Sequence, residues 1–164
     1  RYAVRLTVDG RTETQAFTVI DDPRVGASPA DLAATYALAR DAVAQINTVA
    51  DAVRRIERLQ QEVDARARQV KGTPAEARVT AAATPLRGRL EAVRAALADV
   101  HSQRDQITLH YPVRLYNQLL NVNRMAQSFD RAPTAQARAV LRDLTGQAEA
   151  QLGRLRALEG GELT

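Results

Sequence analysis

The sequence predicts a mainly α-helical fold: an antiparallel up-down-up-down helical bundle with one very long first helix, preceded by an N-terminal β-hairpin. Apolar residues recur at alternating spacings of three and four from Ser28 to Val70, as on one face of a helix. Residues 2–8 instead alternate between apolar and other side chains, as in a strand. Aromatic residues make up only 4% of the chain, with no Trp, so Leu, Val, Ile and Ala must form the core. That composition favours closely packed helices.

Residues 1–20 are predicted to form the hairpin, which we interpret as the remnant of an upstream β-domain. Asp9-Gly10 is a strong two-residue turn, and it places Tyr2 opposite Phe17. Two strands alone are marginally stable in water, so we expect further strands to cover the apolar face. Residues 21–27 are predicted to be a linker, because Pro23 restricts Asp22 to extended backbone. The helical bundle is expected over residues 28–160.

The first helix is predicted over residues 29–70. Ser28 is a good N-cap, Pro29 fits the first turn, and Asp31 lies near the positive end of the helix. At about 1.5 Å per residue this helix is roughly 60 Å long, so several later elements must pack along it. Its predicted core stripe comprises Leu32, Tyr36, Ala39, Val43, Ile46, Ala50, Val53, Ile56, Leu59, Val63, Ala67 and Val70.

Three further helices are predicted over residues 74–108, 112–129 and 134–158, with 161–164 as a tail. Thr73 to Glu76 has the pattern of a capping box, and Gly72 suits the short turn before it. Pro85 is expected to kink the second helix rather than to restart it after a Thr84 cap. If the first two helices are antiparallel, we expect two residues of the second, Leu90 and Val93, to pack against Val43, Ile46 and Val53.

The sequence predicts no metal site, no cofactor and no catalytic residue. His101 and His110 are nine residues apart and fall on different faces of a continuous helix. Asp99 and Asp105 offer carboxylates nearby, but no close His-x-x-x-His or Glu-x-x-His spacing occurs, and the chain has no Cys. Glycine-rich phosphate loops and recognisable Ser/His/Asp constellations are absent as well.

The most unusual polar run lies between Tyr111 and Asn123, and Asn117, Asn121 and Tyr111 are its candidates for a polar contact. Asn117 and Asn121 share one helix face, and they suit either a sugar or the backbone of a partner. The favoured interpretation is a buried or half-buried amide pair that bonds across helices or to the loop before Tyr111. Tyr111 is expected to be a packing residue with a solvated hydroxyl.

The charge pattern argues against nucleic-acid binding and membrane insertion. The formal net charge is +4, but acids and arginines alternate at helical spacing, which predicts pairs between Asp51 and Arg55 and between Glu62 and Arg66, with Asp64 and Arg68 as a third. A nucleic-acid binder concentrates basic residues on one face and usually adds exposed aromatics. No stretch of about 18 apolar residues occurs, as a membrane-spanning helix requires.

Three passages carry a resemblance to a known family: Tyr2 to Val19, then Asp22-Pro23-Arg24-Val25 with Ser28 to Leu32, and Ala132 to Gln136. They resemble the C-terminal region of bacterial sortilin-like β-propeller proteins with Asp-box (BNR) repeats, often labelled glycosyl hydrolase or sialidase. In that family a propeller is followed by a small β-sandwich, a link of this kind and a helical tail. The similarity covers nearly the whole chain.

The resemblance implies a non-catalytic accessory domain of a secreted or envelope-associated propeller protein, serving scaffolding or protein contacts. The alternative is the tail of a glycoside-acting enzyme whose catalytic residues lie in the propeller. The implied partners are the propeller and sandwich of the same protein, and a second copy of the chain could associate through the hairpin. The implied location is periplasmic, outer-envelope or extracellular. Fold alone does not establish activity, so no catalytic position is carried onto this chain.

Overall fold

The computed structural model describes residues 2–20, 22–99, 112–128 and 130–162. These residues form a two-stranded antiparallel hairpin followed by four helices, which confirms the predicted fold class. The elements are β1 (Tyr2–Val8), β2 (Arg11–Phe17), α1 (Pro29–Gln69), α2 (Glu76–Leu97), α3 (Leu115–Gln127) and α4 (Ala135–Glu162).

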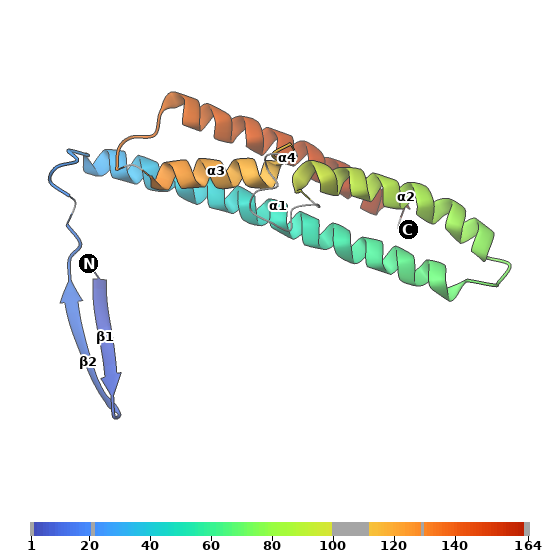
Figure 1. Ribbon diagram of the computed structural model, residues 1–164, viewed down its shortest axis with the longest axis horizontal. Helices are drawn as coiled ribbons and strands as arrows, with labels where there is room; N and C mark the ends of the chain where they lie inside the picture. The colour runs from blue at the N-terminus through green and yellow to red at the C-terminus, as the bar shows by residue number, and fades with distance from the viewer. Residues whose placement is uncertain (1, 21, 100–111, 129, 163–164) are drawn as a thin grey trace.

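Helix α1 is the axis of the molecule, and the other three helices pack along it (Figure 1). Helices α2 and α3 lie end to end beside α1, and both run opposite to it. Helix α4 then returns in the direction of α1 and contacts all three other helices. The predicted up-down-up-down order was therefore wrong, because α2 and α3 run in the same direction. Two short helices together cover the long one, as the length of α1 requires.

The hairpin lies apart from the helices at the N-terminal end of α1, and within the described residues it contacts none of them (Figure 1). Asp9 and Gly10 have positive φ angles of 49° and 77°, as a two-residue hairpin turn requires. The predicted register is confirmed, because Tyr2 pairs with Phe17 and their rings stack at 5.7 Å. The apolar side chains of this face remain exposed, with Leu6 at 64%.

The predicted cap of α1 is confirmed. The Asp31 amide donates to the Ser28 hydroxyl at 3.2 Å, and the Ser28 amide donates to the Asp31 carboxylate at 3.1 Å, which completes a capping box. The Ser28 hydroxyl also donates to this carboxylate, and these bonds lower the pKa of Asp31. Before the cap, Arg24 donates to Asp22 and lowers the pKa of that carboxyl. The Ser28 cap therefore marks the start of α1, and the bonds between Asp22 and Arg24 lie in the linker before it.

The core face of α1 differs from the predicted stripe. Tyr36 is 70% exposed and Val43 is 40% exposed, so their assignment to the core was wrong. Ile46, Ile56 and Val63 of the predicted stripe are buried, which confirms that part of it. The buried row also contains residues that were not predicted, namely Leu38, Ala42, Val49 and Ala52. Both rows have spacings of three and four, and α1 carries apolar residues on both. Which row is buried is decided by the positions of the neighbouring helices.

Helix α2 is shorter than predicted at both ends. The Thr73 capping box does not form: Thr73 donates its hydroxyl to the Val70 carbonyl at 2.7 Å, and Glu76 accepts instead from the Gly72 amide at 2.7 Å. The helix therefore begins at Glu76. It ends at Leu97, because Ala98 has extended backbone, so the extension to residue 108 was wrong as far as the described residues reach.

Pro85 lies inside α2 without ending it. The Thr84 hydroxyl donates to the Thr80 carbonyl at 3.0 Å, one turn back along the same helix. Thr84 therefore belongs to a continuous helix and does not cap a new one, which rules out the restart after Thr84.

Polar pairs fix the antiparallel register of α1 and α2. Asp64 pairs with Arg87 at 2.6 Å, and the Gln60 amide donates to Glu91 at 3.2 Å. Leu90 is buried as predicted, with no exposed surface, but this register sets it beside Gln60. The expected packing of Leu90 and Val93 on Val43 and Ile46 was therefore wrong, because those two residues lie about four turns closer to the N-terminal end of α1. Packing on Val53 stays a prediction.

Apolar residues at helical spacing form the cores of α3 and α4. The α3 stripe is Leu115, Leu119, Val122 and Ala126, and all four are buried. On α4 the buried positions are Ala137, Leu141, Leu144, Ala148 and Leu155. Thr35 of α1 donates its hydroxyl to the Arg131 carbonyl, which ties the α3–α4 connection to the N-terminal end of the bundle. Helix α3 begins at Leu115 rather than at the predicted residue 112. Helix α4 ends at Glu162 rather than at the predicted residue 158.

Candidate functional site

The polar run on α3 forms no enclosed site within the described residues. Asn117 is half-buried and Asn121 is exposed, and neither makes a hydrogen bond to a described side chain. Gln118 makes the contact to the preceding loop, since its amide donates to the Val113 carbonyl at 2.8 Å. Tyr111 lies outside the described residues. A polar contact at these positions therefore stays a prediction.

The residues considered for a metal site fall mostly in residues 100–111, which are not described. This segment contains His101, Asp105 and His110. Within the described ranges, no three His, Asp or Glu side chains lie close enough together to hold a metal ion. The described core also contains no buried polar or charged residue.

The ion pairs join helices more often than the sequence predicted. Asp51 pairs with Arg54 at 2.5 Å rather than with Arg55, and Arg55 pairs with Glu159 of α4. Asp64 pairs with Arg87 of α2 rather than with Arg68. The predicted partners within α1 were therefore wrong for Asp51 and Asp64. Arg55 and Asp64 each pair with a residue on a neighbouring helix. Such a pair cannot be predicted from the spacing of charges along one helix.

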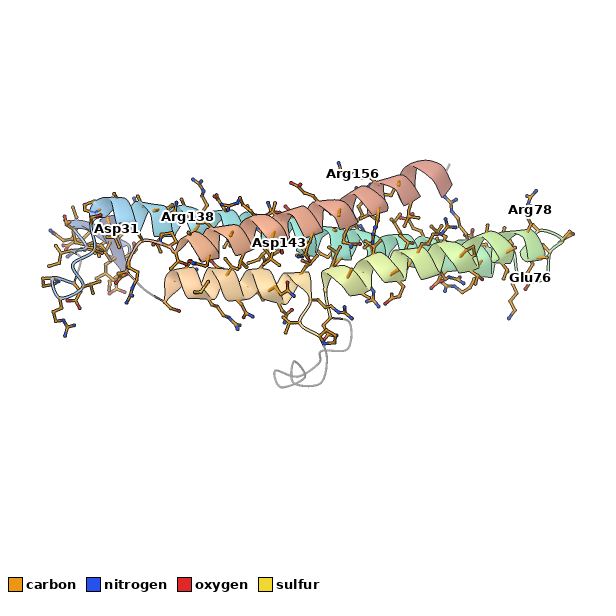
Figure 2. The ribbon with its side chains drawn as sticks, turned by 90° about the horizontal axis from the view of Figure 1, so that it is seen from above. Asp31, Glu76, Arg78, Arg138, Asp143 and Arg156 are labelled. Atoms are coloured by element: carbon orange, nitrogen blue, oxygen red, sulfur yellow. The ribbon has the colours of Figure 1, made fainter. Side chains whose placement is uncertain are left out.

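Basic residues concentrate at the end of the α1–α2 pair, which we call the distal tip and define as residues 66–89. It contains six basic residues and one acidic residue, which gives a formal charge of +5 against +4 for the whole chain. The remainder therefore carries −1. Glu76 and Arg78 mark this end of the molecule in Figure 2. The six basic residues are Arg66, Arg68, Lys71, Arg78, Arg87 and Arg89.

Several of these cations are exposed. Arg66, Arg68, Lys71 and Arg78 are exposed and make no ion pair within the described part of the chain. Arg87 differs, because it is half-buried and paired with Asp64. Four of the six cations of the tip therefore have no ion-pair partner among the described residues.

The distal tip carries an apolar groove of about 750 Å³ between the two helices, which we call the distal groove. Val63 and Leu86 are buried at its floor, Val70 and Val79 are half-buried, and Ala82 is exposed. Arg66 and Arg89 line it on opposite helices. The remaining lining residues are Gln69, Ala83 and Pro85. The groove thus combines an apolar floor with basic rims.

The distal groove lies on the side of α1 that faces α4 in the rest of the bundle. Towards the middle of α1, residues Gln45, Thr48 and Arg55 lie against α4. Arg66 and Gln69 continue that row at helical spacing. The pairing of Glu159 with Arg55 sets the end of α4 at Glu162 about one turn beyond this level, short of the groove. No described element therefore covers the groove.

None of the described helices combines the length and apolar character that crossing a membrane requires. Comparisons with family models, with curated proteins and with solved structures found no significant match. The geometry of the chain itself therefore carries the functional argument.

The distal groove could not be predicted from the spacing of residues within one helix. Its exposure depends on where α4 ends relative to α1. The excess of basic residues in 66–89 was nevertheless readable as a count, against a nearly neutral remainder. Acids and arginines alternate before Arg66, and this alternation drew attention away from the excess of basic residues that follows. Residues 66–89 therefore depart from the alternation of acids and arginines found earlier in α1.

Proposed function

We propose that this chain is a non-catalytic accessory helical domain that provides a rigid scaffold and a protein-contact surface beside a β-domain. The observation that carries the proposal is the hairpin, whose apolar face is exposed and contacts no helix among the described residues. A lone two-stranded ribbon with such a face is marginally stable in water. Further strands upstream of Arg1 complete it in this proposal.

The bundle supports the scaffold role. Its core cluster spans all four helices and contains no hairpin residue. Helix α1 is about 60 Å long, which is enough to hold partners at a defined separation. An apolar core of this kind contributes stability and rigidity rather than chemistry.

The resemblance to BNR-repeat propeller proteins gives the proposal its setting. The upstream β-domain is then a sandwich following a propeller, and the location is periplasmic, outer-envelope or extracellular. When the chain is isolated from the β-domain, a second copy of it can cover the apolar face of the hairpin instead. The proposal assigns any sugar chemistry to the propeller and none to these residues.

Hydrogen exchange tests the proposed β-domain. Amides of residues 2–17 are expected to exchange at least about tenfold more slowly in the full-length protein than in the isolated chain, because flanking strands protect them. Leu6→Glu, on the apolar face, should abolish most of this protection. Thr7→Glu, on the opposite face, is the matched control and should retain it. Equal exchange in the two proteins would refute the proposal of an upstream β-domain.

A further inference from the structure

The distal groove lacks the third helix that completes the packing elsewhere in the bundle. From Leu38 to about Gln60, α1 packs against α2 or α3 on one side and α4 on another. Beyond Gln60, only α2 accompanies it in the described structure. Two antiparallel helices leave one apolar flank uncovered, and a third helix in line with α4 would cover it.

The size and shape of the groove suit a helix. Its lining residues run from Val63 to Val70 on α1, which corresponds to about two helical turns. They run antiparallel on α2 from Arg89 back to Val79. An amphipathic helix placed there would insert apolar side chains at i, i+3, i+4 and i+7 between the two helices.

The arginines beside the groove indicate which charges a bound helix should carry. Arg66 and Arg89 line opposite sides of the groove. Three further exposed cations lie on the same tip without lining it, namely Arg68, Lys71 and Arg78. A helix with glutamate or aspartate beside its apolar stripe would complement these cations. The distal tip of a second copy carries the same charge of +5, so mutual pairing of two tips is disfavoured.

We propose that the distal groove binds an acidic amphipathic helix of a partner protein, held by the apolar floor around Val63 and Leu86 and by the basic rims of Arg66 and Arg89. The proposal deepens the protein-contact role proposed above and rests on it. The two can fail separately, since substitutions in the groove leave the hairpin and its exchange behaviour unchanged.

The test uses the full chain and a fluorescein-labelled synthetic helix of about 21 residues, with leucine at heptad positions a and d and glutamate at e and g. Glutamate at e and g also keeps the peptide from pairing with itself. Fluorescence anisotropy measures its dissociation constant. A second peptide with lysine at e and g is expected to bind at least about tenfold more weakly, because its charges face the arginine rims.

Two matched pairs of variants locate the binding site. Ala82 lines the groove and Ala81 does not, and both are exposed on α2. Ala82→Glu should weaken binding of the acidic peptide at least about tenfold, whereas Ala81→Glu should change it by less than about twofold. Arg66→Glu should likewise weaken binding more than Arg68→Glu, because only Arg66 lines the groove. Circular dichroism checks that each variant stays folded.

Four outcomes would overturn the proposal. The first is no binding of the acidic peptide. The second is an equal loss of peptide affinity in the two variants of each matched pair, which would indicate a general basic surface. The third is binding of anionic phospholipid vesicles or duplex DNA with the same dependence on Ala82 and Arg66, with no preference for the peptide. Concentration-dependent self-association lost on Ala82→Glu would assign the groove to a second copy instead.

Discussion

Ala42→Glu is expected to destabilise the bundle by at least about 3 kcal/mol, because it leaves an unpaired charge in the core. Ala42 has no exposed surface and belongs to the buried row of α1. The core residues around it are apolar, so the new carboxylate finds no cation there. Urea unfolding followed by circular dichroism measures the loss.

Val43→Glu is the matched control for that experiment. Val43 adjoins Ala42, is 40% exposed and was assigned to the core from sequence spacing alone. Its replacement is expected to change stability by less than about 1 kcal/mol, as is usual for surface positions. If Val43→Glu were the more damaging variant, the core face of α1 would be the one that the spacing predicted.

Leu90→Ala is expected to reduce the free energy of unfolding by about 2 to 5 kcal/mol. Leu90 has no exposed surface and lies in α2 beside the Gln60 turn of α1. Removing its branched side chain forfeits buried apolar surface and leaves a cavity that the helices close only in part. Chemical unfolding provides the measurement.

Gly88→Ala is the control within the same helix, and its expected effect has the opposite sign. Gly88 is exposed, and an added Cβ would meet no atom within 4 Å. Alanine should therefore stabilise α2 by about 0.5 to 1 kcal/mol through its better helix propensity. A loss below about 0.5 kcal/mol for Leu90→Ala would show that α2 presents another face to the core.

Local chemistry explains why some elements were predictable. The Asp9-Gly10 turn and the Ser28 cap each depend on a few neighbouring residues, and the structure has both. Helix capping and two-residue turns are decided within a short span of chain. The Ser28 cap and the Asp9-Gly10 turn follow from such local signals, whereas the capping box that the same reasoning predicted at Thr73 does not form.

Other features depend on contacts between distant segments. Helix α1 carries two adjacent apolar rows, and only the positions of its neighbours decide that Ala42 is buried and Val43 exposed. The end of α2 was misplaced because an apolar stripe continues in the sequence past Leu97, although the backbone is extended at Ala98. Pairing of Asp64 with Arg87 likewise depends on the register of α1 against α2.

The distal groove combines both kinds of information. Its charge could be counted from residues 66–89, but its uncovered floor follows from the end of α4, which pairs Glu159 with Arg55. Periodicity along α2 marks Val79, Ala82 and Leu86 as one stripe without showing that Ala82 stays exposed. A helix stripe shows which side chains share a face, and only the assembled bundle shows which of them remain uncovered.

The central claim is that the helical bundle is a folding unit to which the hairpin contributes nothing essential. Circular dichroism during heating of a truncated chain that begins at Ala27 tests it most directly. This chain keeps the Ser28 cap and every buried residue of the core cluster. We expect the helical signal to persist with a cooperative transition. Loss of the helical signal, or a midpoint more than about 10 °C lower, roughly 3 kcal/mol, would show that the hairpin stabilises the core.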